Sequence, residues 1–243
     1  MDKYMEVDIM DSTRFLRNKD LIPQSKLDHV GLVGLGGIGS QLVPLLSIMG
    51  WKKITGWDHD TLEEHNLSTT MFPQGALGKS KAEVAENVSN MYSVKPGNNA
   101  FFQEYYDEAS PTLPKMITCL DNMEGRLVAY NKWLEQSNRQ FFIDLRMGAM
   151  AMEIITATKD NDEYLDSWLP SHQISEEPCT MKHTIFTSSI VAGWGLNNLF
   201  CMLTGKPWYG YIWHGLVPFQ MKTEHLVTNG YLKNVTIESR VNV

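Results

Sequence analysis

Cysteine is scarce in this chain of 243 residues, and positive charge is not in excess. The three cysteines, Cys119, Cys179 and Cys201, are widely spaced and form no Cys-x-x-Cys pair. A four-cysteine zinc site within one chain is therefore excluded, no structural zinc is expected, and a disulfide framework is not indicated. The formal net charge of -7 provides no basic face for neutralising phosphates, so we expect no nucleic-acid partner.

Long uninterrupted apolar runs are also absent. Residues 1–14 are charged and lack the apolar core of a signal peptide. The longest weakly polar stretch, residues 184–204, is interrupted by Asn197 and Asn198, and it predicts a buried helix rather than a membrane span. We therefore expect a cytoplasmic protein with no membrane partner.

A glycine-rich turn is the most informative feature that is present. Residues 30–40 contain Gly34, Gly36 and Gly39 at a Gly-x-Gly-x-x-Gly spacing, after an apolar run that predicts a buried strand. A predicted helix follows, and then a second predicted strand that ends at Asp58. This order is typical of a nucleotide-binding βαβ unit, in which the helix N-terminus binds a phosphate and the acid accepts hydrogen bonds from ribose hydroxyls.

Strands and helices alternate through the first part of the chain. The expected strands cover residues 30–33, 54–57, 100–106, 116–120 and 140–145, and the expected helices cover residues 40–50, 78–92 and 123–137. This alternation favours a doubly wound parallel sheet. Later the pattern changes to a strand over 149–158, a long loop over 168–182, the apolar helix, and short strands over 208–213, 221–227 and 231–238.

The predicted fold class is α/β: a Rossmann-like, doubly wound, mostly parallel sheet with a C-terminal mixed or antiparallel extension. We expect a single domain over residues 1–243, because this length fits one large α/β domain better than two. Its expected parts are an N-terminal helical segment (1–28), a nucleotide-binding core (29–148), and a region with the crossover loop, buried helix and C-terminal strands (149–243).

Further motifs follow the glycine loop in a fixed order. They are Asp58-His-Asp60, Asn66-Leu67, Gly78-Lys-Ser-Lys-Ala-Glu83, and Asp121-Asn122 with Arg126. Thr13-Arg-Phe-Leu-Arg17 precedes them. This ordered set resembles the E1-like adenylyltransferases, the family of ThiF, MoeB and the ubiquitin-activating enzymes, from about residue 13 to residue 204. The glycines alone are a weak signal, whereas five motifs in the right order are a strong one.

The resemblance implies an enzyme that uses ATP and Mg²⁺ to adenylate a carboxylate, with release of pyrophosphate. It implies the C-terminus of a ubiquitin-like protein or peptide as substrate, and a homodimer as the active form. Two alternatives remain open. One is a non-catalytic relative that binds a nucleotide or a ubiquitin-like protein. The other is an NAD-dependent oxidoreductase, which leaves the later motifs unexplained.

The resemblance also implies roles for individual residues. Asp58 would bind the ATP ribose, Asn66 would contact the α-phosphate region, and Lys81 would pair with phosphate oxygens. Asp121 would hold Mg²⁺, and Arg14 would act on the triphosphate as an arginine finger, which the partner subunit supplies in dimeric members. The implied ATP-binding glycines are Gly34, Gly36, Gly37 and Gly39.

Several of these assignments have competitors. Asn66 could instead cap a following turn. Lys79 lies close enough to compete with Lys81, and Arg17 is the alternative to Arg14. Cys179, with Lys182 and His183 nearby in the sequence, is a candidate for a thioester step, although a lone loop cysteine is more often incidental.

One departure from the family pattern concerns charge. The family motif Asn-Leu-x-Arg-Gln places an arginine on the ATP phosphates, but Thr69 stands at that position here. A neutral hydroxyl cannot replace a forked cation on a polyphosphate. Either another cation compensates, with Arg126, Arg146 and Lys79 as the nearest candidates, or ATP turnover is weak or absent. For Arg146 the competing interpretation is an ion pair with Asp144.

Overall fold

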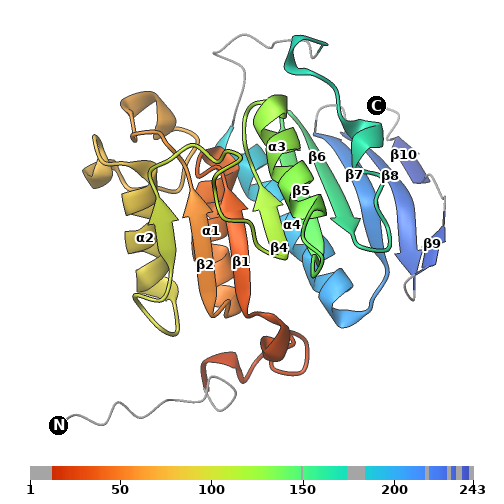
Figure 1. Cartoon of the computed structure of the whole chain (residues 1–243), viewed down its shortest axis with the longest axis horizontal. Helices are drawn as coiled ribbons and strands as arrows, with labels where there is room; N and C mark the ends of the chain where they lie inside the picture. The colour runs from red at the N-terminus through yellow and green to blue at the C-terminus, as the bar shows by residue number, and fades with distance from the viewer. Residues whose placement is uncertain are drawn as a thin grey trace.

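The computed structural model describes residues 13–148, 150–173, 184–216, 219–228, 231–233 and 237–240. Through these residues runs one ten-stranded sheet in the order β10-β8-β7-β6-β5-β4-β1-β2-β3, with β9 beside β8 (Figure 1). Its parallel strands are β1 (His29–Val33), β2 (Lys53–Trp57), β3 (Ala100–Phe102), β4 (Lys115–Thr118) and β5 (Phe141–Met147). The antiparallel strands that follow are β6 (Ala151–Thr158), β7 (Trp208–Leu216), β8 (Phe219–Thr228), β9 (Tyr231–Lys233) and β10 (Ile237–Arg240).

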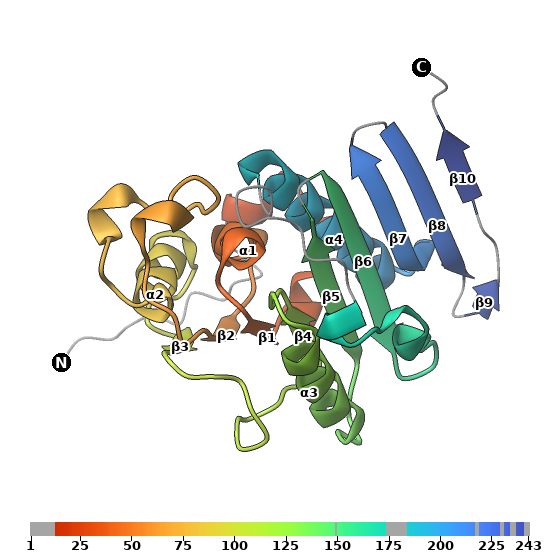
Figure 2. The same cartoon turned by 90° about the horizontal axis from the view of Figure 1, so that it is seen from above.

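Helices cover both faces of the sheet, as Figure 2 shows. On one face lie α1 (Gly37–Met49), α2 (Lys81–Tyr92) and α4 (Ile185–Thr204), and on the other lies α3 (Met123–Leu134). The predicted Rossmann-like fold class is therefore confirmed, and of the two expected forms of the C-terminal extension, mixed or antiparallel, the structure has the antiparallel one.

Each face of the sheet has its own hydrophobic core, because successive strand residues point to opposite sides. Val30 and Leu32 of β1 belong to the cluster that includes the buried residues of α1 and α4. Val33 belongs to an aromatic cluster under α3, which contains Trp133 and Phe142. The near-continuous apolar sequence of β1 follows from burial on both faces.

Two helices and one strand have limits that differ from those that the sequence predicts. The expected helix over 78–92 begins only at Lys81, because Gly78 has a φ of +80° and the Ser80 hydroxyl accepts a hydrogen bond from the Glu83 N–H. The helix that was expected from residue 40 begins at Gly37, so the last two glycines of the loop lie inside α1. The strand expected over 100–106 ends at Phe102.

By length and composition, α4 is the one helix among the described residues that could cross a membrane. It packs on β5, β6 and β7 and against α1. Its Asn198 side chain donates to Thr156 Oγ1 and to the Tyr209 carbonyl and accepts from the Tyr209 N–H, at 2.8 to 3.0 Å. These contacts fix one face of α4 on the sheet, so the predicted helix is present but is buried only in part.

Candidate functional site

The candidate site lies at the carboxyl ends of the parallel strands. β1 pairs with β2 on one side and with β4 on the other, and the chain reaches these neighbours in opposite directions. Ligands of open α/β sheets bind at such a switch point, where the two connecting loops separate. The glycine loop after β1 occupies this position, so the fold brings the sequence motif to the expected edge.

The glycine loop has three positions with different steric demands. Gly34 has a φ of +89°, and a Cβ atom there would lie 2.9 Å from the Cys119 carbonyl, at the end of β4. A Cβ on Gly39 would lie 2.0 Å from the Gly34 oxygen. A Cβ on Gly36 would meet nothing within 4 Å. Gly34 and Gly39 are therefore required by packing, whereas Gly36 leaves an open approach to the backbone at the start of α1.

Asp58 connects the end of β2 to the glycine loop. One carboxylate oxygen accepts the Leu35 N–H at 2.7 Å, and the other accepts the Asp60 N–H at 2.9 Å. Burial raises the pKa of the Asp58 carboxyl, and Lys81 and the two N–H donors offset part of this rise. Asp58 therefore lies where the motif predicts a ribose ligand, and it also holds the loop.

Lys81 and Lys79 occupy different environments. The Lys81 side chain is 8% exposed, and its Nζ lies 2.6 Å from Asp60 Oδ2 at the end of β2. Lys79 is half exposed and pairs with Glu83 on the surface of α2 at 2.6 Å. Of the two lysines, only Lys81 places its charge beside Asp58, the residue that holds the glycine loop.

Changing Lys81 to methionine is expected to raise the pKa of Asp58 further, because the nearest positive charge is removed. The pKa of Asp58 in the folded chain lies above its ordinary value, which is that of the unfolded chain. At a pH between these two pKa values, the folded chain therefore binds more protons than the unfolded chain. The contribution of this carboxyl to the free energy of unfolding therefore falls as the pH rises through that interval. An NMR titration of the Asp58 carboxyl carbon measures the shift, and Lys79→Met is the control. An equal response in both variants would contradict the assignment.

The segment with Asn66 and Thr69 lies over the glycine loop. The Thr69 carbonyl oxygen lies 3.3 Å from a Cβ built on Gly37, and the Met71 N–H donates to Ser40 Oγ at 3.0 Å. Asn66 closes a capping box in its own 3-10 turn, Glu64–Asn66, through an N–H donated by Glu63. Asn66 thus does have a capping role, but within its own turn rather than the following one, and its Nδ2 makes no hydrogen bond to the residues that the structure describes.

Asp121 is exposed just beyond the end of β4. Its neighbour Asn122 caps α3 by accepting the Gly125 N–H at 2.7 Å, and the Asn122 amide lies 3.3 Å from Asp121 Oδ1. A carboxylate with a solvent-facing oxygen is a ligand type that Mg²⁺ prefers, so this residue fits the predicted metal.

The arginines considered as substitutes for the missing charge are both bound to Asp144. Arg126 pairs with Asp144 Oδ1 and Arg146 with Asp144 Oδ2, the latter at 2.7 Å. Tyr164 donates to the same carboxylate at 3.1 Å. Asp144 is fully buried, and a buried carboxylate requires such partners. The interpretation of Arg146 as an ion-pair partner of Asp144 is confirmed, and the charge absent at Thr69 is not replaced by either arginine.

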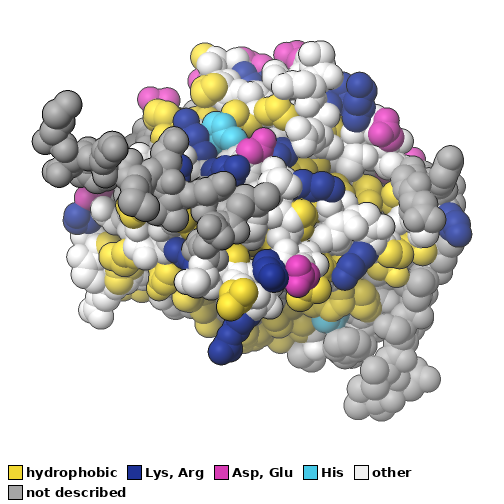
Figure 3. Space-filling view, turned by 90° about the horizontal axis from the view of Figure 1, so that it is seen from below, with side chains coloured by type: hydrophobic (Ala, Val, Ile, Leu, Met, Phe, Trp, Pro, Cys, Tyr) yellow, Lys and Arg dark blue, Asp and Glu magenta, His cyan; other side chains and the backbone are white. Residues whose placement is uncertain are grey.

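Arg14 lies at the opposite end of the helical layer from the glycine loop. It contacts the carbonyl of Tyr92, the last residue of α2, while its neighbour Phe15 packs against Gly50 at the end of α1. α1 contains 13 residues, so at about 1.5 Å per residue its ends lie roughly 20 Å apart. Arg14 therefore cannot reach the glycine loop of its own chain. Figure 3 shows the face seen from below, where basic and hydrophobic side chains are intermixed.

The cysteines give no support for a reactive thiol within the described residues. Burial raises the pKa of Cys119, which disfavours its thiolate. Cys201 is a free, partly buried residue of α4. The thioester candidate Cys179 lies outside the described residues.

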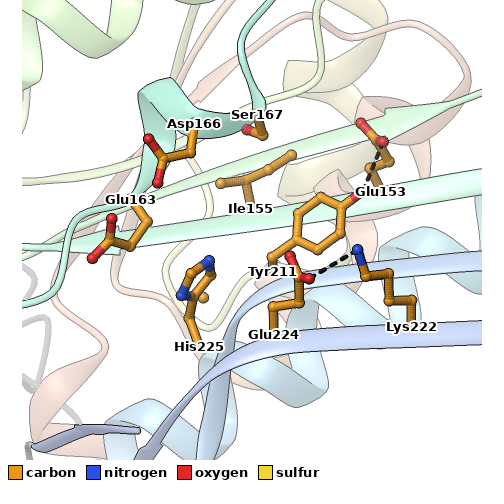
Figure 4. Close-up of a pocket in the computed structure, with 10 residues that line it drawn as sticks. Glu153, Ile155, Glu163, Asp166, Ser167, Tyr211, Lys222, Glu224 and His225 are labelled. Carbon is orange, nitrogen blue, oxygen red and sulfur yellow. Dashed lines mark hydrogen bonds and ion pairs between the residues drawn. The ribbon is translucent and has the colours of Figure 1, made fainter. Parts of the chain in front are cut away.

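A hollow of about 190 Å³ that the sequence did not predict lies on the antiparallel half of the sheet (Figure 4). Its charged lining comes from β6, the 3-10 turn Tyr164–Ser167 with its preceding residue, and β8, and it comprises Glu153, Glu163, Asp166, Lys222, Glu224 and His225. Tyr211 donates to Glu153 at 3.0 Å, and Lys222 lies 2.8 Å from Glu224. No common spacing connects these residues, which is why sequence analysis missed the hollow.

Comparison with known proteins identifies the family of this chain. A model of the ThiF family matches residues 18–194. The chain belongs to the ThiF family. The matched span contains the glycine loop, Asp58, Lys81 and Asp121, and it extends into α4. The predicted membership of the E1-like group is therefore confirmed.

Several curated relatives of this ThiF-family chain are named ubiquitin-like modifier-activating enzyme 5. The Xenopus laevis protein is 30% identical over 117 residues, which are 40% of this chain and 29% of that protein. The Branchiostoma floridae protein is 25% identical over 158 residues, which are 54% of this chain and 38% of that protein. The chain thus spans about a third of the length of these relatives.

Solved structures share the fold over nearly the whole ThiF-family chain. Escherichia coli MccB with AMPCPP and MccA has a TM-score of 0.70 and 16% identity, and the match covers 94% of this chain and 76% of that one. PaaA has a TM-score of 0.69 and 14% identity, with 92% and 77% covered. At these identities the likeness shows the fold.

Proposed function

We propose that this chain is an ATP-dependent adenylyltransferase that activates the terminal carboxylate of a ubiquitin-like protein or peptide. The open backbone at Gly36, with Asp58 and the buried Lys81 beside it, carries the proposal. Membership of the ThiF family supports it. So do the relatives named as activating enzymes and the MccB structures that contain ATP or MccA.

In the proposed reaction, a carboxylate oxygen of the substrate attacks the α-phosphorus of ATP. The bond from this phosphorus to the oxygen that bridges to the β-phosphate breaks, and pyrophosphate leaves with the bonding electrons. The N–H groups at the start of α1 bind phosphate oxygens, and the Asp58 carboxylate accepts a hydrogen bond from a ribose hydroxyl. Lys81 and the Asn66 Nδ2 lower the repulsion between the two anions. A magnesium ion held by Asp121 would neutralise phosphate charge.

ATP–pyrophosphate exchange tests this function. The purified chain should exchange labelled pyrophosphate into ATP when a ubiquitin-like protein or peptide with a free C-terminus is present, and an amidated C-terminus should abolish the exchange. Calorimetric titration should show binding of Mg-ATP and none of NAD. Binding of NAD alone would overturn the proposal.

Thr69 favours a second candidate, a relative that binds ATP or a ubiquitin-like tail without adenylating it. The hydroxyl of Thr69 donates to the Asn66 carbonyl at 3.1 Å, so it closes the local turn instead of carrying charge. Binding of Mg-ATP without exchange for any carboxylate substrate would favour this candidate.

Changing Thr69 to arginine is expected to raise the affinity for ATP about 5- to 10-fold, because a guanidinium donates charged hydrogen bonds to phosphate. The gain should shrink as the salt concentration increases. Calorimetry measures both effects. Ser68→Arg places the same charge on the exposed neighbouring residue and should give a smaller gain. Equal gains would show that position 69 does not face the phosphates.

We also propose a homodimer as the active form. Because Arg14 lies at the far end of α1 from its own glycine loop, any action on ATP requires a second subunit. Exposed Leu16 and Leu21 in the same segment are 63% and 56% accessible and offer apolar surface for such a contact. Sedimentation equilibrium should therefore give twice the chain mass.

A further inference from the structure

Arg126 belongs to the Asp121-Asn122-x-x-x-Arg motif, but the proposed reaction gives it no task. Its side chain is buried although it carries a charge. Burying a guanidinium is costly unless its donors are all used, so the partners of Arg126 indicate what it does.

The guanidinium of Arg126 joins three pieces of backbone and side chain. One terminal nitrogen pairs with Asp144 and donates to the Leu145 carbonyl at 3.1 Å. The other terminal nitrogen donates to the carbonyl of Leu120, the residue before Asp121. Arg126 therefore links β5 to the peptide that carries the proposed metal ligand.

Leu120 lies beyond the hydrogen bonds of the sheet, and Arg126 donates the hydrogen bond to its carbonyl. β4 ends at Thr118, and the Cys119 N–H makes the next contact with β1, to the Val33 carbonyl at 2.7 Å. Leu120 lies beyond both, between the strand and the cap of α3. Its carbonyl is fixed by Arg126, which is itself held by the fully buried Asp144.

We propose that Arg126 is a positioning residue for Asp121: it fixes the 120–121 peptide and so orients the Asp121 carboxylate toward the magnesium ion of bound ATP. This inference rests on the proposed function. Residues that orient a metal ligand typically affect metal affinity by about 10- to 100-fold when they are removed.

The experiment measures ATP binding by calorimetry, in magnesium and in EDTA, for the wild type and a set of variants. The ratio of the two affinities is the magnesium response. Arg126→Gln should reduce this response about tenfold or more. Arg146→Gln is the matched control: it also removes one ion pair from Asp144, but the described hydrogen bonds of Arg146 go to Asp144, Glu153 and the Ser167 carbonyl and not to Leu120. It should keep the response near that of the wild type.

Arg126→Lys covers the case in which Arg126→Gln does not fold. Lysine keeps a positive charge near Asp144, but an ammonium lacks the planar fork needed to hold Asp144 and the Leu120 carbonyl together. It should therefore fold and still lose magnesium response. Two double variants combine Asp121→Asn with either Arg126→Gln or Arg126→Lys. Each should show the same magnesium response as Asp121→Asn alone, because both changes act through the same metal ligand.

The outcomes separate the inference from the function. Equal losses in Arg126→Gln and Arg146→Gln, or additive losses in the double variant, would overturn the positioning role while the wild type still binds ATP with a magnesium response. A wild type that binds no ATP, or binds it equally in EDTA, would overturn the proposed function and this inference with it.

Discussion

Asp121→Asn is expected to lower the rate of ATP–pyrophosphate exchange by about 100- to 1,000-fold, because stabilising developing phosphate charge contributes several kcal/mol to such reactions. Asparagine keeps the shape of the side chain and removes the negative charge that would attract the metal ion. Asp121 is exposed, so the free energy of unfolding should change little. The loss should appear in the exchange assay at saturating ATP and substrate.

Asp160→Asn is the control for this prediction, since it removes an exposed carboxylate after β6, away from the parallel strand ends. It should leave exchange unchanged. If Asp121→Asn retained wild-type exchange across a magnesium titration, Asp121 would not be the metal ligand.

Gly39→Ala is expected to lower the free energy of unfolding by about 3 kcal/mol or more, because the added methyl group cannot be accommodated without moving backbone. Its Cβ would lie 2.0 Å from the carbonyl oxygen of Gly34, and the near neighbour is main chain rather than a flexible side chain. The two ends of the loop would have to separate, which displaces the start of α1 from β1. Urea denaturation followed by circular dichroism measures the loss.

Gly36→Ala provides the comparison within the same loop. A Cβ on Gly36 meets no protein atom within 4 Å, so stability should change by less than about 1 kcal/mol. Affinity for ATP should fall roughly 10- to 100-fold, because the methyl group occupies the approach to the phosphates. Equal destabilisation by both substitutions, or unchanged ATP affinity in Gly36→Ala, would contradict the steric argument.

The parts of the fold that depend on local sequence were predictable. The βαβ unit around the glycine loop follows from apolar strands, glycine spacing and an acid at a strand end, all within 30 residues. The antiparallel extension was also expected, although its pairing order was not, since strand pairing depends on contacts between residues far apart in sequence. The start of α2 was misplaced because Gly78 and Ser80 both suit a helix start.

The sequence predicted that the glycine loop, Asp58 and Asp121 follow strands of one sheet, but it did not predict the surroundings of these residues. Lys79 and Lys81 are both compatible with the motif, and only burial beside Asp60 separates them. The ion pairs of Arg126 and Arg146 with Asp144 can be seen only in the three-dimensional structure. The same holds for the distance of Arg14 from the glycine loop. A motif gives residue types and order, whereas charge pairing depends on which strands become neighbours.

The hydrogen bond from the Leu35 N–H to Asp58 fixes the shape of the proposed nucleotide site before any ligand binds. The carboxylate proposed for the ribose already fixes the turn proposed for the phosphates, so the conformational entropy of shaping the loop is lost during folding and not during binding. The fixed distance between these two proposed subsites then selects ligands whose phosphate and ribose are separated by the same distance. Ligands that carry only a phosphate or only a ribose should bind poorly, and a nucleotide that spans both should gain more than the sum of its parts.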